Sequence, residues 1–153
     1  MRIIIVAFLV FTSVFMVQCN SGKEAEDADI YAGMEFRTRI RMRQYMVQGQ
    51  QLYQIHCANC HGDDGKGLGK LIPPLAKADY FLQDLTRAIC ISRNGIKGSM
   101  LVNNIEYNQQ MPDHKDLTAL EIAEIITYAS NSWGNVSGLT EVKEVEAVLN
   151  NCK

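Results

Sequence analysis

Residues 57–61 read Cys-Ala-Asn-Cys-His, the pattern in this chain with the most specific chemistry. Two thiols three positions apart at a helix end can each add across a vinyl group of haem, and a histidine directly after the second cysteine can then reach the iron. A zinc site would need a second Cys/His pair at ligand spacing, and His114 and the other cysteines form none. A thioredoxin-like redox motif would need a β-α-β context. We therefore predict that Cys57 and Cys60 attach one haem c covalently and that His61 is an axial ligand of its iron.

Apolar residues recur at three- and four-residue steps directly before this motif, which indicates a helix that leads into it. The helical pattern starts at Met42 and includes Tyr45, Gly49 and Tyr53. A glycine inside a helix costs about 1 kcal/mol relative to alanine, so Gly49 suggests that another helix approaches closely there.

Further elements are predicted after the motif. Residues 79–93 carry leucine and isoleucine at helical spacing, and Asn94-Gly95 is a typical stop, so we expect a second helix. A short hairpin is expected about Asn103 and Asn104, because asparagine tolerates the positive φ angles of a tight turn.

The last helix of the core is predicted from Thr118 and Glu121, which form a capping box before an apolar stripe that reaches Trp133. Residues 140–152 again place apolar side chains on one face, which predicts an additional C-terminal helix.

Over about residues 44–134 the chain resembles the class I, monohaem cytochrome c family. The resemblance rests on Gly49 and Tyr53 before the haem motif, on the Gly-Lys-Gly of residues 65–67 and on the Ile-Pro-Pro-Leu of residues 72–75. It implies an all-α cytochrome c fold, with three to four helices around one covalently bound haem and the C-terminal helix as an extension.

Two finer points come from the same resemblance. In that family the carbonyl of a proline two positions before a leucine accepts a hydrogen bond from the axial histidine, which gives this role to Pro73 and would orient the His61 imidazole. The Asn-Ser-Trp-Gly-Asn of residues 131–135 is similar to cytochrome c domains appended to copper nitrite reductases, although the chain has no copper-binding Cys/His set.

The second axial ligand has three candidates. The family places a Met-Pro pair in the loop before the last core helix, which favours Met111, followed here by Pro112. Pro112 also biases Met111 to an extended conformation. Met100 is the alternative, and His114 is a weaker one.

With both axial positions filled, the resemblance implies a one-electron carrier rather than an enzyme, cycling between Fe(II) and Fe(III) and docking weakly on redox proteins. The expected partners are an oxidase, a quinol-oxidising complex, a reductase or a dehydrogenase, with no nucleic acid and no small-molecule substrate. The alternative is a haem protein with an open distal position that acts as a peroxidase or gas sensor, which requires that Met111 does not bind iron.

The N-terminus predicts export. An uncharged apolar run fills most of residues 1–18, too short for a membrane-spanning helix but suited to a signal peptide. Cys19 follows a sequence that resembles a lipobox, although Met and Gln replace its usual Leu and small residue. We expect a lipidated Cys19, a tether over residues 19–41 and a haem domain over residues 42–153, held on the extracytoplasmic side of a membrane.

Four arginines, at positions 37, 39, 41 and 43, lie at the junction of the predicted tether and the haem domain. On a helix they would not form one patch, so a solvated face is the favoured interpretation and contact with anionic lipid the alternative. The whole chain of 153 residues has a net charge of −2, which gives no electrostatic case for nucleic acid.

Each of the five cysteines has a predicted role. Cys19 takes lipid, Cys57 and Cys60 take haem, and Cys90 and Cys152 are left as a disulfide pair in an oxidising compartment.

Overall fold

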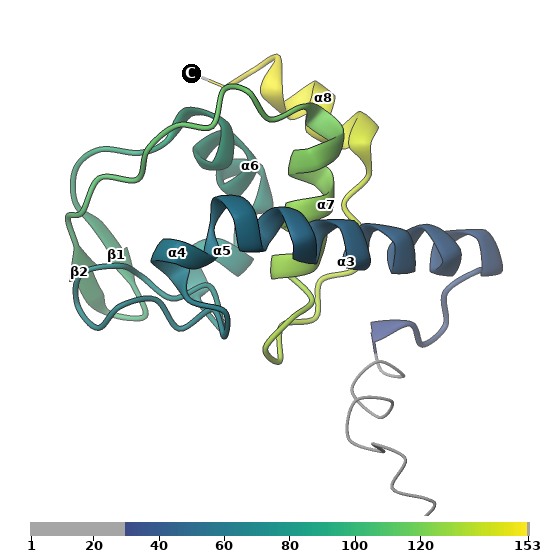
Figure 1. Cartoon of the computed structure of the whole chain (residues 1–153), viewed down its shortest axis with the longest axis horizontal. Helices are drawn as coiled ribbons and strands as arrows, with labels where there is room; N and C mark the ends of the chain where they lie inside the picture. Colours follow the sequence, from purple (N-terminus) through teal and green to yellow (C-terminus); the bar gives the residue numbers. More distant parts are fainter. Residues whose placement is uncertain (1–29, 153) are drawn as a thin grey trace, which may run out of the picture.

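The computed structural model describes residues 30–152, and Figure 1 shows its helices arranged around one end of a long first helix. The predicted signal peptide and Cys19 lie outside the described residues. Among those residues, no helix is both long and apolar enough to cross a membrane. The elements are α3 (Phe36–His56), α4 (Ala58–His61), α5 (Asp79–Leu82), α6 (Leu85–Asn94), β1 (Met100–Val102), β2 (Ile105–Tyr107), α7 (Ala119–Ala129) and α8 (Val142–Leu149).

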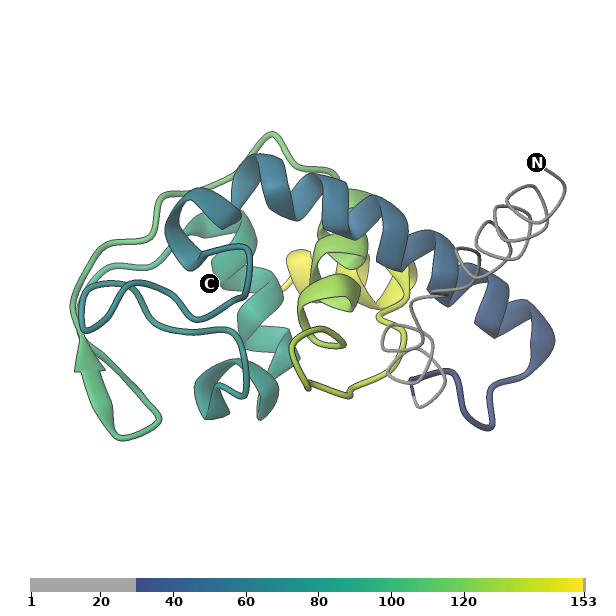
Figure 2. The same cartoon turned by 60° about the horizontal axis from the view of Figure 1, so that its bottom comes forward.

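The crossing of α3 over α7 is the centre of the fold (Figures 1 and 2). A Cβ atom on Gly49 of α3 would lie 2.0 Å from the carbonyl oxygen of Glu124 and 2.8 Å from Cβ of Tyr128, so only glycine lets the two helices come this close. Beside the crossing, the Tyr53 ring stacks at a tilt against Tyr128 and Trp133, with ring centroids 5.4 and 5.2 Å away. The close helix approach predicted from Gly49 is confirmed.

The first helix starts earlier than its apolar pattern indicates. It begins at Phe36 and not at Met42, because the Glu35 side chain accepts hydrogen bonds from the first backbone N–H groups and caps the helix. Arg41, which was placed in the tether, lies within the helix and forms an ion pair with Glu141 just before α8. The predicted boundary at residue 41 is therefore too late, since residues 36–41 belong to α3.

The second helix is divided in two. Asp84 interrupts it between α5 and α6, and its side chain accepts a hydrogen bond from the backbone N–H of Arg87 at the start of α6. An aspartate stabilises a helix start better than a helix interior, which is the reason for the break. The helix ends before Gly95, as predicted.

The hairpin and the last core helix form where the sequence predicts them. Asn103 and Asn104 adopt φ angles of 48° and 61° between β1 and β2. Thr118 and Glu121 form the full capping box of α7. That helix ends at Ala129, four residues before the expected Trp133, which instead adopts a φ of 58°.

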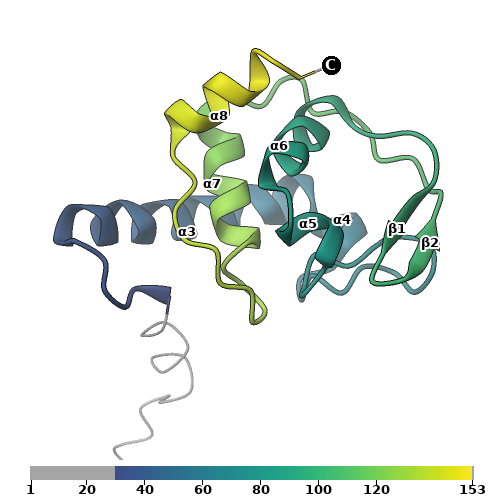
Figure 3. The ribbon, with the colours of Figure 1, turned by 180° about the vertical axis from the view of Figure 1, so that it is seen from behind.

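The C-terminal helix α8 packs on α7 and α6, as the view from behind shows (Figure 3). Val145 of α8 is completely buried in the core. A disulfide joins Cys90 of α6 to Cys152, the pair that the cysteine count left over. The predicted C-terminal extension is thus an integral part of an essentially all-α fold.

Candidate haem site

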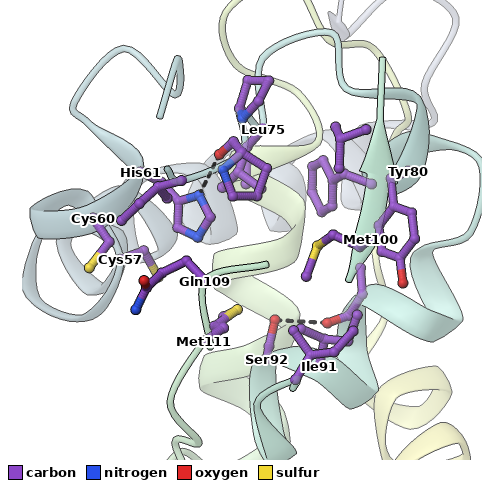
Figure 4. Close-up of a pocket in the computed structure, with 18 of the residues that line it drawn as sticks. Cys57, Cys60, His61, Leu75, Tyr80, Ile91, Ser92, Met100, Gln109 and Met111 are labelled. Carbon is purple, nitrogen blue, oxygen red and sulfur yellow. Dashed lines mark hydrogen bonds between the residues drawn. The ribbon is translucent and has the colours of Figure 1, made fainter. Parts of the chain in front are cut away.

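An apolar pocket opens at the end of α3, bounded by α4, α6, α7 and the loops on either side of the hairpin. The space inside it that no atom fills is about 1000 Å³, including its open mouth. Figure 4 shows side chains from distant parts of the sequence around this space. They include Cys57, Cys60, His61, Met100 and Met111.

The two cysteines lie where α3 passes into the single turn α4. Cys57 is the residue between the two helices, and Cys60 lies within α4. Cys57 is half-buried, whereas Cys60 is exposed at the edge of the pocket. Burial, followed by the nearby Cys60, raises the pKa of the Cys57 thiol to about 12, so it stays protonated at neutral pH. Both cysteines line the pocket and neither is in a disulfide, so both thiols are available to a ligand placed there.

His61 is buried, and its ring orientation is defined by one contact. Its Nδ1 lies 3.0 Å from the carbonyl oxygen of Pro73, the contact drawn as a dashed line in Figure 4. Burial lowers the pKa of His61, so the imidazole is neutral near pH 7. Because a carbonyl only accepts, Nδ1 carries the proton and donates it, which leaves the lone pair on Nε2 free for a metal.

The loop after α4 brings Pro73 under the histidine. Gly67 donates its N–H to the carbonyl of His61, and Leu75 donates its N–H to the carbonyl of Gly65. Gly67 has a φ of 69°, and a Cβ there would lie 2.3 Å from the carbonyl oxygen of Ile72. Its replacement would therefore move the segment that carries Pro73.

Both candidate methionines line the pocket, but His114 is not among its lining residues. Met111 pairs through its backbone N–H and carbonyl with Ile96, which holds it beside the end of α6. Met100 lies in β1 opposite Tyr107. The centroid of the His114 ring lies instead 5.8 Å from that of the His56 ring, so the structure does not bring His114 into the pocket.

The comparisons with known proteins decide the family. The family model for cytochrome c matches residues 46–133, more than half of the chain. The chain belongs to the cytochrome c family. Its cofactor is accordingly haem c, and the predicted cytochrome c fold is confirmed.

Two groups of cytochrome relatives stand out. Cytochrome c-552 of Thermus thermophilus is 28% identical over 105 residues, which are 66% of this chain and 79% of that protein. The cytochrome c subunit of a quinone alcohol dehydrogenase from Gluconacetobacter polyoxogenes is 32% identical over 92 residues, 58% of this chain and 19% of the subunit. The corresponding subunit of Gluconobacter oxydans is 30% identical over 90 residues, 57% of this chain and 18% of the subunit. This cytochrome c thus spans about a fifth of the length of those subunits.

Arg87 of α6 is a site residue that its sequence context did not indicate. It is the one permanently charged side chain in the pocket lining. Among the buried side-chain nitrogen and oxygen atoms of residues 30–152, only the Nε of Arg87 lacks a hydrogen-bond partner. Its guanidinium stacks on Tyr80, with Cζ 3.8 Å from the ring centroid, and donates to the carbonyl of Tyr80. Its Nη1 also forms an ion pair with Asp84, at 3.6 Å. A haem carries two propionate carboxylates, so an arginine whose Nε has no partner fits this cofactor.

Asn135 ends the Asn-Ser-Trp-Gly-Asn segment noted in the sequence, but no role was predicted for it. Its buried side-chain amide donates to the carbonyls of Leu75 and Ala129, and its Oδ1 accepts from the N–H of Lys77. These three bonds join the Pro73 loop to the end of α7. Asn135 therefore fixes the loop that orients His61.

Proposed function

We propose that this cytochrome c is an exported, membrane-tethered one-electron carrier whose haem is held by thioethers to Cys57 and Cys60 and by His61 and Met111. The single observation that carries the proposal is the convergence of these four side chains on one apolar pocket. Membership of the cytochrome c family supports the electron-carrier role. No bond of a substrate is made or broken in this function.

The haem iron supplies an Fe(II)/Fe(III) couple when it is bound. His61 contributes a neutral imidazole whose direction is set by Pro73, and Met111 contributes a thioether, which favours a high potential. The apolar lining excludes water, so little solvent has to reorganise around the iron as its charge changes. Arg87, whose Nε has no hydrogen-bond partner, would hold a haem propionate.

Cys60 is exposed, so a haem edge attached to it would lie at the surface, where a redox partner could approach. An oxidase, a quinol-oxidising complex, a reductase or a dehydrogenase would serve as partner. The relatives that are subunits of alcohol dehydrogenases support a dehydrogenase among these candidates.

The tethering proposal rests on the sequence alone. Residues 1–18 would direct export and be removed, and Cys19 would carry the lipid that holds the domain on the extracytoplasmic side of a membrane. Mass spectrometry of the intact protein tests it: a chain that begins at Cys19 with added acyl mass is expected. A chain that begins elsewhere without acyl mass would refute it.

The axial ligands are tested by the absorption spectrum of the ferric protein. A sulfur-to-iron charge-transfer band should be present in the native protein and absent in Met111→Ala, whereas Met100→Ala, a change of the same size in the same pocket, should keep it. Loss of the band in Met100→Ala alone would make Met100 the ligand. A high-spin, ligand-binding spectrum in the native protein would overturn the carrier and favour the peroxidase or gas sensor.

A further inference from the structure

The first half of α3 carries an exposed apolar stripe that faces away from the core. Phe36, Ile40 and Val47 are 65%, 41% and 56% exposed, and their spacing of four and seven residues places them on one face of the helix. The buried residues of α3, among them Met42 and Tyr45, lie on the opposite face. The stripe is therefore not part of the core.

Arginines flank this stripe on both sides. Arg37 lies on one side of the line from Phe36 to Val47, and Arg39 and Arg43 lie on the other, by their positions on the helical wheel. Arg41 is engaged in the ion pair with Glu141, and the Arg43 guanidinium lies 5.1 Å from the ring of Tyr31. The arginines therefore do not form one patch. They lie along the two edges of the apolar stripe formed by Phe36, Ile40 and Val47.

The charge of α3 is unusual for this protein. Its 21 residues contain four arginines and no aspartate or glutamate, although the whole chain has 17 acidic and 15 basic residues. An apolar strip bordered by arginine is the composition of helices that lie in the interface of a membrane, with apolar side chains among the acyl chains and cations at the phosphates.

We propose that residues 36–47 of α3 lie on an anionic phospholipid surface, with Phe36, Ile40 and Val47 inserted. The inference deepens the proposed tethering: 17 positions separate Cys19 from Phe36, a span of at most about 60 Å. The haem pocket lies at the other end of α3, about 30 Å along the helix. The contact therefore leaves the pocket free for a redox partner and fixes its distance from the membrane.

The test is flotation of the holoprotein with vesicles. One form is the native mature chain, and in the other Cys19→Ser follows an export leader that is cleaved without lipidation. The Cys19→Ser form should bind vesicles of phosphatidylglycerol and phosphatidylcholine, and should not bind phosphatidylcholine alone. Replacing Arg37, Arg39 and Arg43 by glutamine should lower the partition coefficient about 100-fold, roughly fivefold per arginine, and Phe36→Ser with Ile40→Ser should lower it as well.

The matched control replaces three exposed lysines outside α3 by glutamine, Lys70, Lys97 and Lys143, with the same loss of charge. It should leave binding within about threefold of the native value, because charges farther than a Debye length from the lipid are screened. Equal losses in the arginine and lysine variants, or no binding to anionic vesicles, would overturn the proposal. So would a dimer of the native chain that the Phe36→Ser, Ile40→Ser variant abolishes, since the face would then bind a second copy.

Comparing the native mature chain with the Cys19→Ser form distinguishes failure of the α3 contact from failure of the lipid anchor. If the native chain floats with phosphatidylcholine while Cys19→Ser fails on anionic vesicles, the anchor holds and the α3 contact is refuted. If Cys19→Ser binds anionic vesicles while the native chain does not float with phosphatidylcholine, the contact holds and the anchor fails.

Discussion

Replacing Gly49 by alanine tests whether the close approach of α3 and α7 organises the fold. The added Cβ would lie 2.0 Å from the Glu124 carbonyl oxygen and 2.8 Å from Cβ of Tyr128. To reach an ordinary contact of 3.4 Å, the backbones would have to separate by about 1.4 Å, against a core in which Tyr53 is completely buried. Overpacking of this kind costs about 1–3 kcal/mol and sometimes more.

A 2.0 Å contact with backbone places the overpacking cost at the upper end of this range, about 3 kcal/mol. Because alanine is intrinsically about 1 kcal/mol better than glycine in a helix, the expected net effect is a loss of about 2 kcal/mol of unfolding free energy. Denaturant unfolding of the holoprotein followed by far-ultraviolet circular dichroism measures it. Gln48, which is exposed on the same helix, supplies the control: Gln48→Ala should be more stable than Gln48→Gly by about 1 kcal/mol. A Gly49→Ala protein as stable as the native one would refute the close-approach argument.

Three further outcomes follow from other contacts. Replacing Cys90 and Cys152 by serine should cost up to about 4 kcal/mol on the entropic model, because the bond closes a span of 62 residues; unchanged stability in the double variant would contradict this. Arg87→Gln should lower the midpoint potential of the haem by the order of 60 mV, which for one electron is a tenfold change in the redox equilibrium, and Arg87→Lys should restore part of it; an unchanged potential in redox titration would exclude the propionate contact. The Thr118 backbone N–H and hydroxyl lower the pKa of Glu121 from 4.5, so the stability from this contact is present above pH 4.5 and is lost as pH falls through the folded pKa. Glu121→Gln should therefore flatten the acid limb of the stability curve, and an unaltered limb would contradict the capping role.

Local sequence patterns predicted the elements that depend on local interactions. The Thr118–Glu121 capping box and the Asn103–Asn104 turn formed where expected, because each needs only neighbouring backbone groups. The start of α3 was missed, since Glu35 was counted as part of the tether although its side chain caps the helix. The break at Asp84 was missed because the apolar spacing continues across it, so the aspartate that caps α6 was not recognised as a helix start.

The tertiary structure decided which of the identified residues share a site. Cys57, Cys60 and His61 are close together in sequence, so their chemistry is recognisable without a fold, and the pairing of Cys90 with Cys152 also followed from the cysteine count. That Met100 and Met111 both reach the pocket while His114 does not depends on how the hairpin and its flanking loops pack, which is set by contacts between residues far apart in the sequence.

The unpaired Nε of Arg87 and the bonds of Asn135 likewise arise only when α6, α7 and the Pro73 loop come together. The sequence alone therefore determined the cofactor chemistry, because attachment uses a contiguous motif. The environment of the cofactor required the fold, because burial and hydrogen bonding are properties of residues brought together from separate parts of the chain.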